Sequence, residues 1–285
     1  MTALNGKKIS FIGAGKAGVS LGSYFYSKNL AIGGYLSRSA ASAESAARIT
    51  SSEVFTDVAR LVEHSAIIFI TTPDGLIKEV WDDMAGCDIK DRVICHASGS
   101  LSSAVFDGIA ERGACGCSVH PMYAFASRDG DFKGLENACF TLEGDACALE
   151  RIKDIFFTTG NRTMVISQDA KTLYHAANVA VSNLVLALVS IGCDCLEGCG
   201  AEGAEPLDAL MPLVKGNVDN IARMGLIRSL TGPAERNDIA TVAGHIEVLP
   251  AEYRLLYKIL TKRLVMLSQK AHPERDYSDM LEILE

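Results

Sequence analysis

The sequence predicts an α/β protein in which a Rossmann-type, doubly wound parallel sheet is followed by an all-helical C-terminal domain. A glycine-rich turn, GAGKAG, directly follows the first apolar run of the chain. Apolar runs and helical patterns then alternate until about residue 167, after which the strand signals stop. Because single cores begin to split near a length of 285 residues, two domains are the default. We expect the sheet domain over residues 1–167 and the helical domain over residues 168–285.

The predicted strands are short apolar runs that end in small or polar residues. The run SAIIFITTP is apolar without alternation, which is typical of a strand covered on both faces. Strands separated by helical stretches indicate parallel pairing in one sheet. We expect strands within residues 7–15, 30–39, 65–73, 91–100, 114–125, 137–144 and 162–168, and helices over 16–28, 40–48 and 146–158.

The second half has helical patterning over residues 169–198, 205–226, 236–248 and 250–272. The breaks between these segments are CGAEGAEP, LTGP and LP. The most apolar segment, AANVAVSNLVLALVSIG, contains two Asn and two Ser residues. We therefore expect a helix buried in protein there, and no membrane span.

Charge and cysteine content limit the classes of partner. The formal net charge of -8 argues against nucleic acid and anionic membranes, which both need a basic surface. The chain start has no apolar signal core, so we expect a cytoplasmic protein whose nine cysteines are reduced. The cluster of Cys193, Cys195 and Cys199 lacks a nearby His and zinc-ligand spacing, which favours thiols at a helix end and no metal.

The glycine turn is the first candidate binding site. Gly13 allows the tight turn, Gly15 lets the backbone approach a pyrophosphate, and Gly18 lets helix and strand pack closely. The first helical residues, Lys16 and Ala17, belong to a helix N-terminus that favours phosphate. The pattern predicts dinucleotide binding, and a tight turn without a ligand is the alternative.

The stretch GYLSRS indicates which dinucleotide is bound. Arg38 lies twenty residues after Gly18, where NAD-binding folds carry an acid for the ribose hydroxyls. A guanidinium there pairs with a phosphate, and Ser37 and Ser39 can donate to the same oxygens. The sequence therefore predicts NADP(H), with an ordinary surface Arg as the alternative.

Further loops are expected at the same edge of the sheet. Thr72 and Pro73 follow one predicted strand, Ser98 follows the next, and His120 follows a third. Ligands of open parallel sheets bind beyond the carboxyl ends of the strands. We expect all four residues near the nicotinamide, with Ser98 and His120 also contacting a small substrate. For the two histidines His96 and His120, the alternative is a purely structural role.

The first helix of the second half carries a polar stripe. Lys171, His175, Asn178 and Ser182 recur at helical spacing, which places them on one face. Hydride delivery needs a proton donor and groups that fix the polarised bond. Lys171 is the candidate donor, Asn178 can orient a carbonyl, and His175 can donate or relay. The alternative is a Lys at a helix start and a satisfied core His.

A second polar cluster follows LTGP. Arg236 is the candidate clamp for an anionic substrate group. Asp238 sits where a helix begins, so capping with an ordinary salt bridge is the alternative.

These motifs together resemble a bacterial family of Rossmann-like proteins with an all-helical C-terminal domain of unknown function. The resemblance spans nearly the whole chain and rests on the glycine turn, HASGS, HPMYAF, KxxYHAAN and LTGPxxRxDxxTVxxH. The family is similar to pyrroline-5-carboxylate reductases, deazaflavin-dependent NADP reductases, and 6-phosphogluconate and β-hydroxyacid dehydrogenases. It often has Gly between the Arg and Asp of the last motif, where this chain has Asn237.

The resemblance implies an oxidoreductase. In the related dehydrogenases a Lys and an Asn on the first long helix after the sheet serve catalysis, which implies Lys171 with His175 or Asn178. We expect NADP(H)-dependent hydride transfer to or from a small C=O or C=N substrate between the two domains. By analogy, a homodimer through the helical domain is expected. The alternative is a non-catalytic NADP-binding sensor or scaffold dimer, which has no need for Lys171 and His175 to face the nicotinamide.

Overall fold

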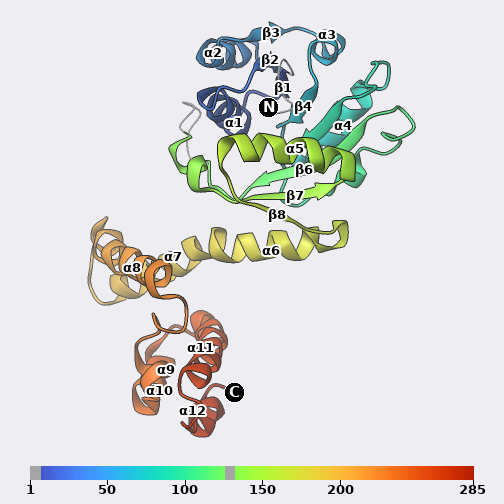
Figure 1. The fold of residues 1–285 in the computed structure, drawn as a ribbon. Helices are drawn as coiled ribbons and strands as arrows, with labels where there is room; N and C mark the ends of the chain where they lie inside the picture. Colours follow the sequence, from blue (N-terminus) through green and yellow to red (C-terminus); the bar gives the residue numbers. More distant parts are fainter. Residues whose placement is uncertain (1–7, 126–131) are drawn as a thin grey trace. The chain divides into compact units, whose positions relative to one another are not determined.

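The computed structural model describes residues 8–125 and 132–285. The chain divides into two compact units, Met1–Ser182 and Asn183–Glu285. The first unit contains the sheet and the second is helical, so the predicted fold class is confirmed (Figure 1).

One mostly parallel sheet organises the first unit. Its strand order is β3-β2-β1-β4-β5-β6-β7-β8, and β7 runs antiparallel to β6. The sequence did not predict β3, which has only three residues, two of them exposed. The strands are β1 (Ile9–Ile12), β2 (Ile32–Leu36), β3 (Glu53–Phe55), β4 (Ile67–Ile70), β5 (Val93–His96), β6 (Cys115–Pro121), β7 (Phe140–Gly144) and β8 (Thr163–Val165).

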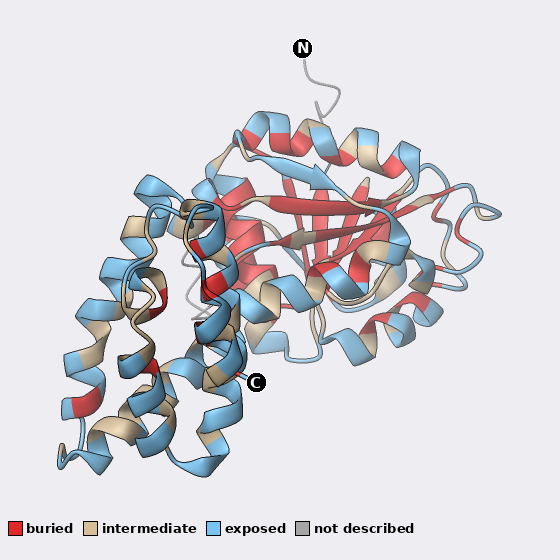
Figure 2. Ribbon diagram, turned by 90° about the horizontal axis from the view of Figure 1, so that it is seen from below, coloured by how far each residue is buried: buried red, intermediate tan, exposed pale blue. Residues whose placement is uncertain are grey.

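Helices cover both faces of this sheet, which explains the continuously apolar runs. Along β4, Ile67 and Phe69 join the core beneath α1, α2 and α5, whereas Ile68 and Ile70 join the core beneath α3 and α4. Figure 2 shows that buried residues concentrate in the strands. The helices of the first unit are α1 (Lys16–Ser27), α2 (Ala40–Thr50), α3 (Val58–Glu63), α4 (Ile77–Asp83), α5 (Ala146–Thr159) and α6 (Lys171–Val181), with short 3-10 turns η1 (Asp74–Leu76), η2 (Ser103–Val105), η3 (Lys133–Asn137) and η4 (Gln168–Ala170).

The second unit has a small core of its own. Val242, Val265, Tyr277 and Met280 are buried together between α10, α11 and α12. The short helix α12 was not predicted. The helices are α7 (Asn183–Gly198), α8 (Glu205–Met224), α9 (Pro233–Arg236), α10 (Ile239–Val248), α11 (Ala251–Ala271) and α12 (Ser278–Ile283).

The expected burial of the apolar helix is wrong for the single chain. Leu184 and Leu186 on α7 are 53% and 71% exposed, and Val181 on α6 is 75% exposed. Gln168–Gly198 is the one helical stretch in the described residues that is long and apolar enough to cross a membrane, and its most apolar window has no buried residue. The apolar pattern identified a hydrophobic surface on α6 and α7 that is unfavourable in water, but the sequence did not show what buries this surface.

The expectation that all cysteines are reduced is also wrong. A disulfide joins Cys115 at the start of β6 to Cys147 in the first turn of α5, with Cα atoms 6.2 Å apart. The two residues meet because α5 follows β7, the antiparallel neighbour of β6, and returns over the sheet. No spacing rule could reveal this pair, since the contact depends on how the elements pack.

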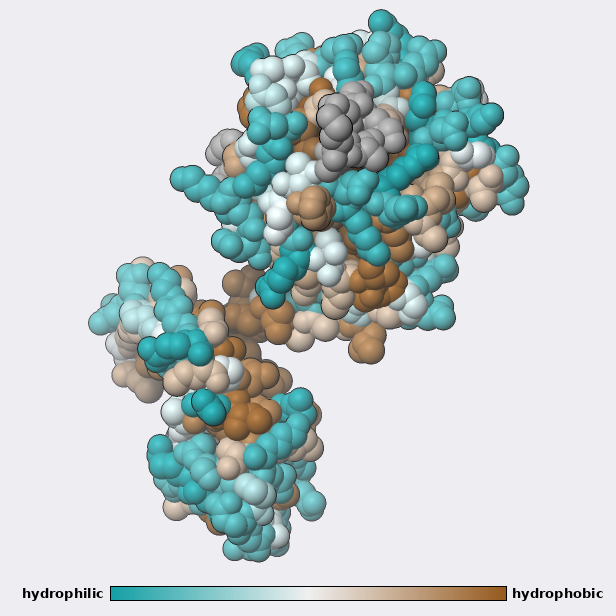
Figure 3. Space-filling view, in the orientation of Figure 1, coloured by the Kyte–Doolittle hydropathy of each residue, from teal (hydrophilic) through white to brown (hydrophobic). Residues whose placement is uncertain are grey.

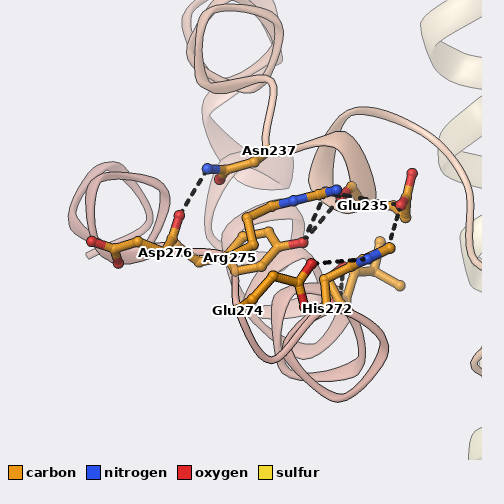
Figure 4. Close-up of polar contacts among 9 residues, drawn as sticks. Glu235, Asn237, His272, Glu274, Arg275 and Asp276 are labelled. Atoms are coloured by element: carbon orange, nitrogen blue, oxygen red, sulfur yellow. Dashed lines mark hydrogen bonds and ion pairs between the residues drawn. The ribbon is translucent and has the colours of Figure 1, made fainter.

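The last predicted motif holds the C-terminal segment in place (Figure 4). The amide of Asn237 donates to the carbonyl of Asp276 at 2.9 Å. The carboxylate of Glu235 lies 2.8 Å from Nε2 of His272, and its carbonyl accepts from the Tyr277 hydroxyl at 3.0 Å. Asn237 has φ +57°, a left-handed conformation that Gly adopts readily and Asn tolerates. This conformation explains why Gly can occupy the same position in the resembling family.

We predict that Asn237→Ala lowers the free energy of unfolding by about 1–2 kcal/mol, because it loses one hydrogen bond and places Cβ in a left-handed residue. Asn237→Gly loses the same bond without that strain, so it should be the more stable variant. Urea unfolding curves of the two variants measure the difference, and an Ala variant as stable as the Gly variant would contradict this account.

Candidate functional site

A cavity of about 680 Å³ lies at the carboxyl ends of β1, β2 and β4. All of its lining residues belong to the first unit. The cavity brings together three segments that separate sequence patterns predicted to bind a cofactor. They are the glycine turn at Gly13, Ala14 and Gly15, the stretch Ser37, Arg38 and Ser39, and the strand end Thr71, Thr72 and Pro73.

Two of the three glycines in the glycine turn are required, because a Cβ at either position would clash with neighbouring atoms. Gly13 has φ +115°, and a Cβ on it would lie 2.8 Å from the carbonyl carbon of Thr71. A Cβ on Gly18 would lie 2.3 Å from the Gly13 carbonyl oxygen and 2.4 Å from Thr71 Oγ1. Gly15 differs, because a Cβ there would meet nothing within 4 Å and would project from a residue that lines the cavity. The glycine at position 15 therefore keeps the backbone open to a ligand.

Polar atoms without protein partners surround this open backbone. The N–H groups of Ala14 and Gly15 donate no hydrogen bond within the described part of the chain, and no side chain caps α1. The hydroxyl of Thr72 is buried and lacks a partner there as well. These groups fit the pyrophosphate of a dinucleotide, which needs N–H and O–H donors at a helix N-terminus. Lys16 and Ala17 form the first turn of α1 and are not among the lining residues.

Arg38 is free to bind a ligand. Its side chain lines the cavity and has no hydrogen bond or ion pair with any described residue. Ser39 caps α2 by accepting from the Ser42 amide at 3.3 Å, and Ser37 Oγ accepts weakly from the Ser39 amide at 3.4 Å. Because α2 begins at this cap, its N-terminus also faces the cavity edge. The position combines a guanidinium, two hydroxyls and a helix N-terminus, all of which favour phosphate.

A polar network that is exposed at Asp74 and buried from Ser98 to Lys171 begins where the cavity lining ends. Asp74 directly follows Pro73, and one of its carboxylate oxygens accepts from Ser98 Oγ at 2.7 Å and from Ser100 Oγ at 2.8 Å. These bonds join the loop after β4 to the loop after β5. The candidate cofactor cavity and the polar network are therefore consecutive along one segment of the chain.

Lys171 lies at the centre of this network. It is only 2% exposed, and its ammonium donates to the Ser98 carbonyl at 3.0 Å and to Ser118 Oγ at 2.7 Å. Burial lowers the pKa of Lys171 to about 8, against opposing effects of Glu143 and Asp74. The lysine predicted on the helix stripe thus ties α6 to the loop after β5 and to the middle of β6.

Glu143 is a second buried charge, and sequence reasoning missed it. It is 2% exposed on β7, opposite Ser118 in the sheet. Its carboxylate accepts from the amide of Ser103 at 2.8 Å and from the Ser103 hydroxyl at 2.7 Å. An acid in the middle of a predicted strand is the one signal that could have drawn attention to it, because unpaired buried acids are rare.

The two histidines differ in role. His96 is fully buried, with Nε2 3.2 Å from the Ser102 carbonyl and Nδ1 accepting from the Ser98 amide at 3.2 Å. Burial lowers its pKa to about 4, so it is a neutral residue that shapes the loop after β5. His120 is only partly buried, and its Nδ1 lies 2.6 Å from the hydroxyl of Tyr174. The structural alternative thus describes His96, while His120 lies at the mouth of the network.

The remaining stripe residues bond along α6, and Asn178 also lies close enough to Tyr174 to lower the pKa of the phenol. Asn178 Nδ2 donates to the Tyr174 carbonyl at 2.8 Å, and Ser182 Oγ donates to the Asn178 carbonyl at 2.7 Å. His175 is half-buried and lies close enough to His120 to lower the pKa of that group. Tyr174, which lies between the stripe residues, is 8% exposed and was not predicted.

Arg236 lies in the second unit at the end of α9, with an exposed side chain. Asp238 accepts from the Thr241 amide at 3.1 Å and from its hydroxyl at 2.7 Å, which is the capping arrangement given as the alternative. Substrate binding by Arg236 stays a prediction.

Comparisons with known proteins agree with this architecture. A family model for a Rossmann-like domain matches residues 4–121, and one for a domain of unknown function, DUF2520, matches residues 138–264. No curated protein matches the chain. A solved protein from Thermotoga maritima is 28% identical with a TM-score of 0.75, covering 93% of this chain and 99% of that chain.

Two further solved structures are more distant in sequence and show the fold alone. A proposed NADP oxidoreductase from Bacteroides fragilis is 20% identical with a TM-score of 0.71, covering 93% of this chain and 100% of that chain. A reductive aminase from Aspergillus terreus, in complex with NADPH and ethyl-5-oxohexanoate, is 16% identical with a TM-score of 0.65, covering 98% and 99%. The chain therefore combines a Rossmann-like domain with a C-terminal DUF2520 domain.

Proposed function

We propose that this protein is an NADP(H)-dependent oxidoreductase that transfers a hydride between the nicotinamide and a small C=O or C=N substrate. One observation carries the proposal: the segment that lines the cavity up to Pro73 continues directly to Asp74, which is hydrogen-bonded to Ser98 in the network around Lys171. A dinucleotide needs the first part, and proton-coupled hydride transfer needs titratable groups near its far end. The fold shared with NADPH-bound and proposed NADP enzymes supports the same cofactor.

Different residues of the cavity bind different parts of NADP(H). The amides of Ala14 and Gly15 and the hydroxyl of Thr72 suit the pyrophosphate, and the unpaired guanidinium of Arg38 suits the 2′-phosphate. The bound cofactor supplies the hydride, and the chain supplies orientation and charge. Ser98 and His120, at the ends of β5 and β6, are the predicted substrate contacts, since they lie on the network side of Pro73.

Lys171 contributes a positive charge whose presence depends on pH. Its ammonium fixes the carbonyl of Ser98, in the loop after β5, and the hydroxyl of Ser118, within strand β6. A cation so placed stabilises negative charge that develops as a carbonyl is reduced. Direct proton donation by Lys171, with His175 or Asn178 as second residue, stays a prediction.

We predict that one lysine titrates at a pH of about 8, because burial lowers the pKa of Lys171 from its ordinary value of 10.5. The folded chain then binds fewer protons than the unfolded chain between pH 8 and 10.5, so this group's contribution to stability rises with pH in that interval. NMR of protein labelled with ¹³C at lysine Cε measures the titration. The shifted signal should be absent from Lys171→Met, and a full set of lysines titrating near the ordinary value would contradict the buried site.

We predict that the protein oxidises NADPH when offered small ketones, 2-oxo acids or imines. We also predict that Arg38→Ala weakens the binding of NADPH about tenfold or more and changes the binding of NADH little. The reason is that hydrogen bonds to a charged group contribute about 1.5–3 kcal/mol, and only NADPH carries the 2′-phosphate. The loss of cofactor absorbance measures turnover, and fluorescence titration measures both dissociation constants.

Arg48→Ala is the matched control, because Arg48 is exposed on the same helix, α2, and does not line the cavity. Equal losses for the two cofactors in Arg38→Ala would refute the assigned phosphate site. NADPH binding without turnover of any carbonyl or imine would instead favour the non-catalytic sensor or scaffold.

We further propose that the protein is a homodimer through its helical domain. Between Lys171 and Asp194 the chain has no charged residue, and large apolar side chains there are exposed. Figure 3 shows hydrophobic surface over the helices of the second unit. Exposed apolar area of this kind is costly in water, and a second copy covers it most simply with a twofold axis.

Sedimentation equilibrium should give a mass near twice the chain's 30.4 kDa. Leu186→Lys should shift the protein toward the monomer, because it places a charge in the apolar surface of α7. Ile49→Lys on α2, where the native side chain is 41% exposed, should leave the mass unchanged. A wild-type protein that stays monomeric, or that needs detergent to stay in solution, would refute the dimer.

A further inference from the structure

We propose that His120 and Tyr174 deliver the proton that accompanies hydride transfer, with Nε2–H of His120 as the direct donor and the Tyr174 hydroxyl refilling Nδ1. This inference rests on the proposed function and names the groups that perform its proton step. It assigns a role to Tyr174, which belongs to the motif KxxYHAAN but was not among the predicted site residues.

The two side chains form one hydrogen-bonded unit across two elements. His120 lies near the end of β6 and Tyr174 lies on α6, yet Nδ1 and the hydroxyl are 2.6 Å apart. Their rings meet edge to face, with centroids 5.6 Å apart and planes at 84°. The phenol cannot swing away easily, because Tyr174 is 8% exposed. The geometry fixes the imidazole relative to the buried network.

This bond determines which ring nitrogen can reach a substrate. When the phenol donates to Nδ1, the neutral imidazole carries its proton on Nε2. Nε2 has no hydrogen-bond partner among residues 8–125 and 132–285 and lies over Gly99, where an added Cβ would approach it to 2.8 Å. Only glycine at position 99 leaves room for this imidazole at the loop that follows β5. The free N–H is therefore directed along the same loop that Lys171 holds in place.

The surroundings favour proton transfer by the pair of His120 and Tyr174 over transfer by His120 alone or by Lys171 alone. Burial lowers the pKa of His120 to about 4, so a stored imidazolium is scarce at neutral pH. A neutral imidazole that gave up Nε2–H unaided would become an imidazolate, which a phenol proton at Nδ1 prevents. Lys171 already uses its ammonium to bind Ser98 and Ser118 and is 2% exposed. In this relay it is a positioning residue, and His120 replaces it as the direct donor predicted from the sequence.

The negative charge left on Tyr174 has three neighbours that can stabilise it: Lys171, Thr141 and Asn178. Lys171 Nζ lies 5.6 Å from the centre of the tyrosine ring. Thr141, opposite His120 in the sheet, has a buried hydroxyl without a partner in the described chain, and it lies close enough to Tyr174 to lower the pKa of the phenol. Burial acts in the other direction and raises that pKa, so Thr141 and Asn178, which both lower it, offset part of the cost.

The step balances in atoms and electrons. The hydride forms the new C–H bond, and the electron pair of the C=O or C=N π bond takes the proton from Nε2. The Tyr174 O–H proton moves to Nδ1, which leaves a neutral imidazole and a phenolate. Before the next turnover the Nδ1 proton returns to the phenolate and a proton from water is taken up at Nε2, which restores the starting pair; the reverse sequence serves oxidation.

The test begins with the free protein and needs no substrate. Long-range ¹H–¹⁵N NMR of the histidine rings should show His120 as the Nε2–H tautomer in the wild type, and a loss of that preference in Tyr174→Phe. The matched control is Tyr257→Phe, which removes the hydroxyl 2.7 Å from Nδ1 of His245 in the second unit. An Nδ1–H tautomer at His120 in the wild type, or a tautomer unaffected by Tyr174→Phe, would overturn the proposal.

The kinetic arm uses single-turnover oxidation of bound NADPH by cyclohexanone, alone and with methylamine. Tyr174→Phe should slow the step about 10²-fold while leaving the NADPH dissociation constant unchanged, because general acid catalysis typically contributes that much. Tyr257→Phe should match the wild type, and a Tyr174→Phe rate equal to the wild type would overturn the relay. If the wild-type protein oxidises NADPH with no carbonyl or imine, the proposed function fails, whereas the tautomer measurement still decides the His120–Tyr174 pairing.

Discussion

The contact between the glycine turn and the end of β4 is the constraint on which the candidate site depends. Thr71 Oγ1 donates to the Gly13 carbonyl at 2.8 Å, and the approach is so close that neither Gly13 nor Gly18 can carry a Cβ. The contact holds the start of α1 against the strand end, so the unpaired N–H groups open onto the cavity. It also fixes the segment from Thr72 to Asp74, which joins the cavity to the polar network.

A second interaction, the pair of hydrogen bonds from Lys171 to Ser98 and Ser118, joins the helix α6 to the sheet. Burying the ammonium of Lys171 is unfavourable in itself, and hydrogen bonds to Ser98 and Ser118 offset that cost. The result is a fixed positive charge that ties the loop after β5 and the strand β6 to α6. His120 and Tyr174 then meet beside this charge, because β6 and α6 are held together there. A cofactor pocket and a proton-transferring pair therefore follow from one sheet edge and one helix.

The sequence predicted what short-range patterns encode. The sheet, the glycine turn and Arg38 follow from spacing along one or two elements, and the cavity brings them together. Contacts between distant elements escaped it: Glu143 was hidden in an apolar strand, and the Cys115–Cys147 disulfide depends on the packing of α5. The first helix after the sheet contains one residue that was predicted and one that was missed, since helical spacing selected Lys171 but not Tyr174. Helical spacing does not show which face of a helix contacts the sheet, and an aromatic residue in an apolar helix is indistinguishable from an ordinary core residue.

The central claim is that the amino-terminal cavity binds a 2′-phosphorylated pyridine dinucleotide. Isothermal titration calorimetry of the wild-type protein with NADPH and with NADH tests it most directly. The account predicts one site per chain for NADPH, with NADH bound about tenfold or more weakly, because the guanidinium of Arg38 has no other described partner. Absence of binding heat with either cofactor, or tighter binding of NADH, would contradict it.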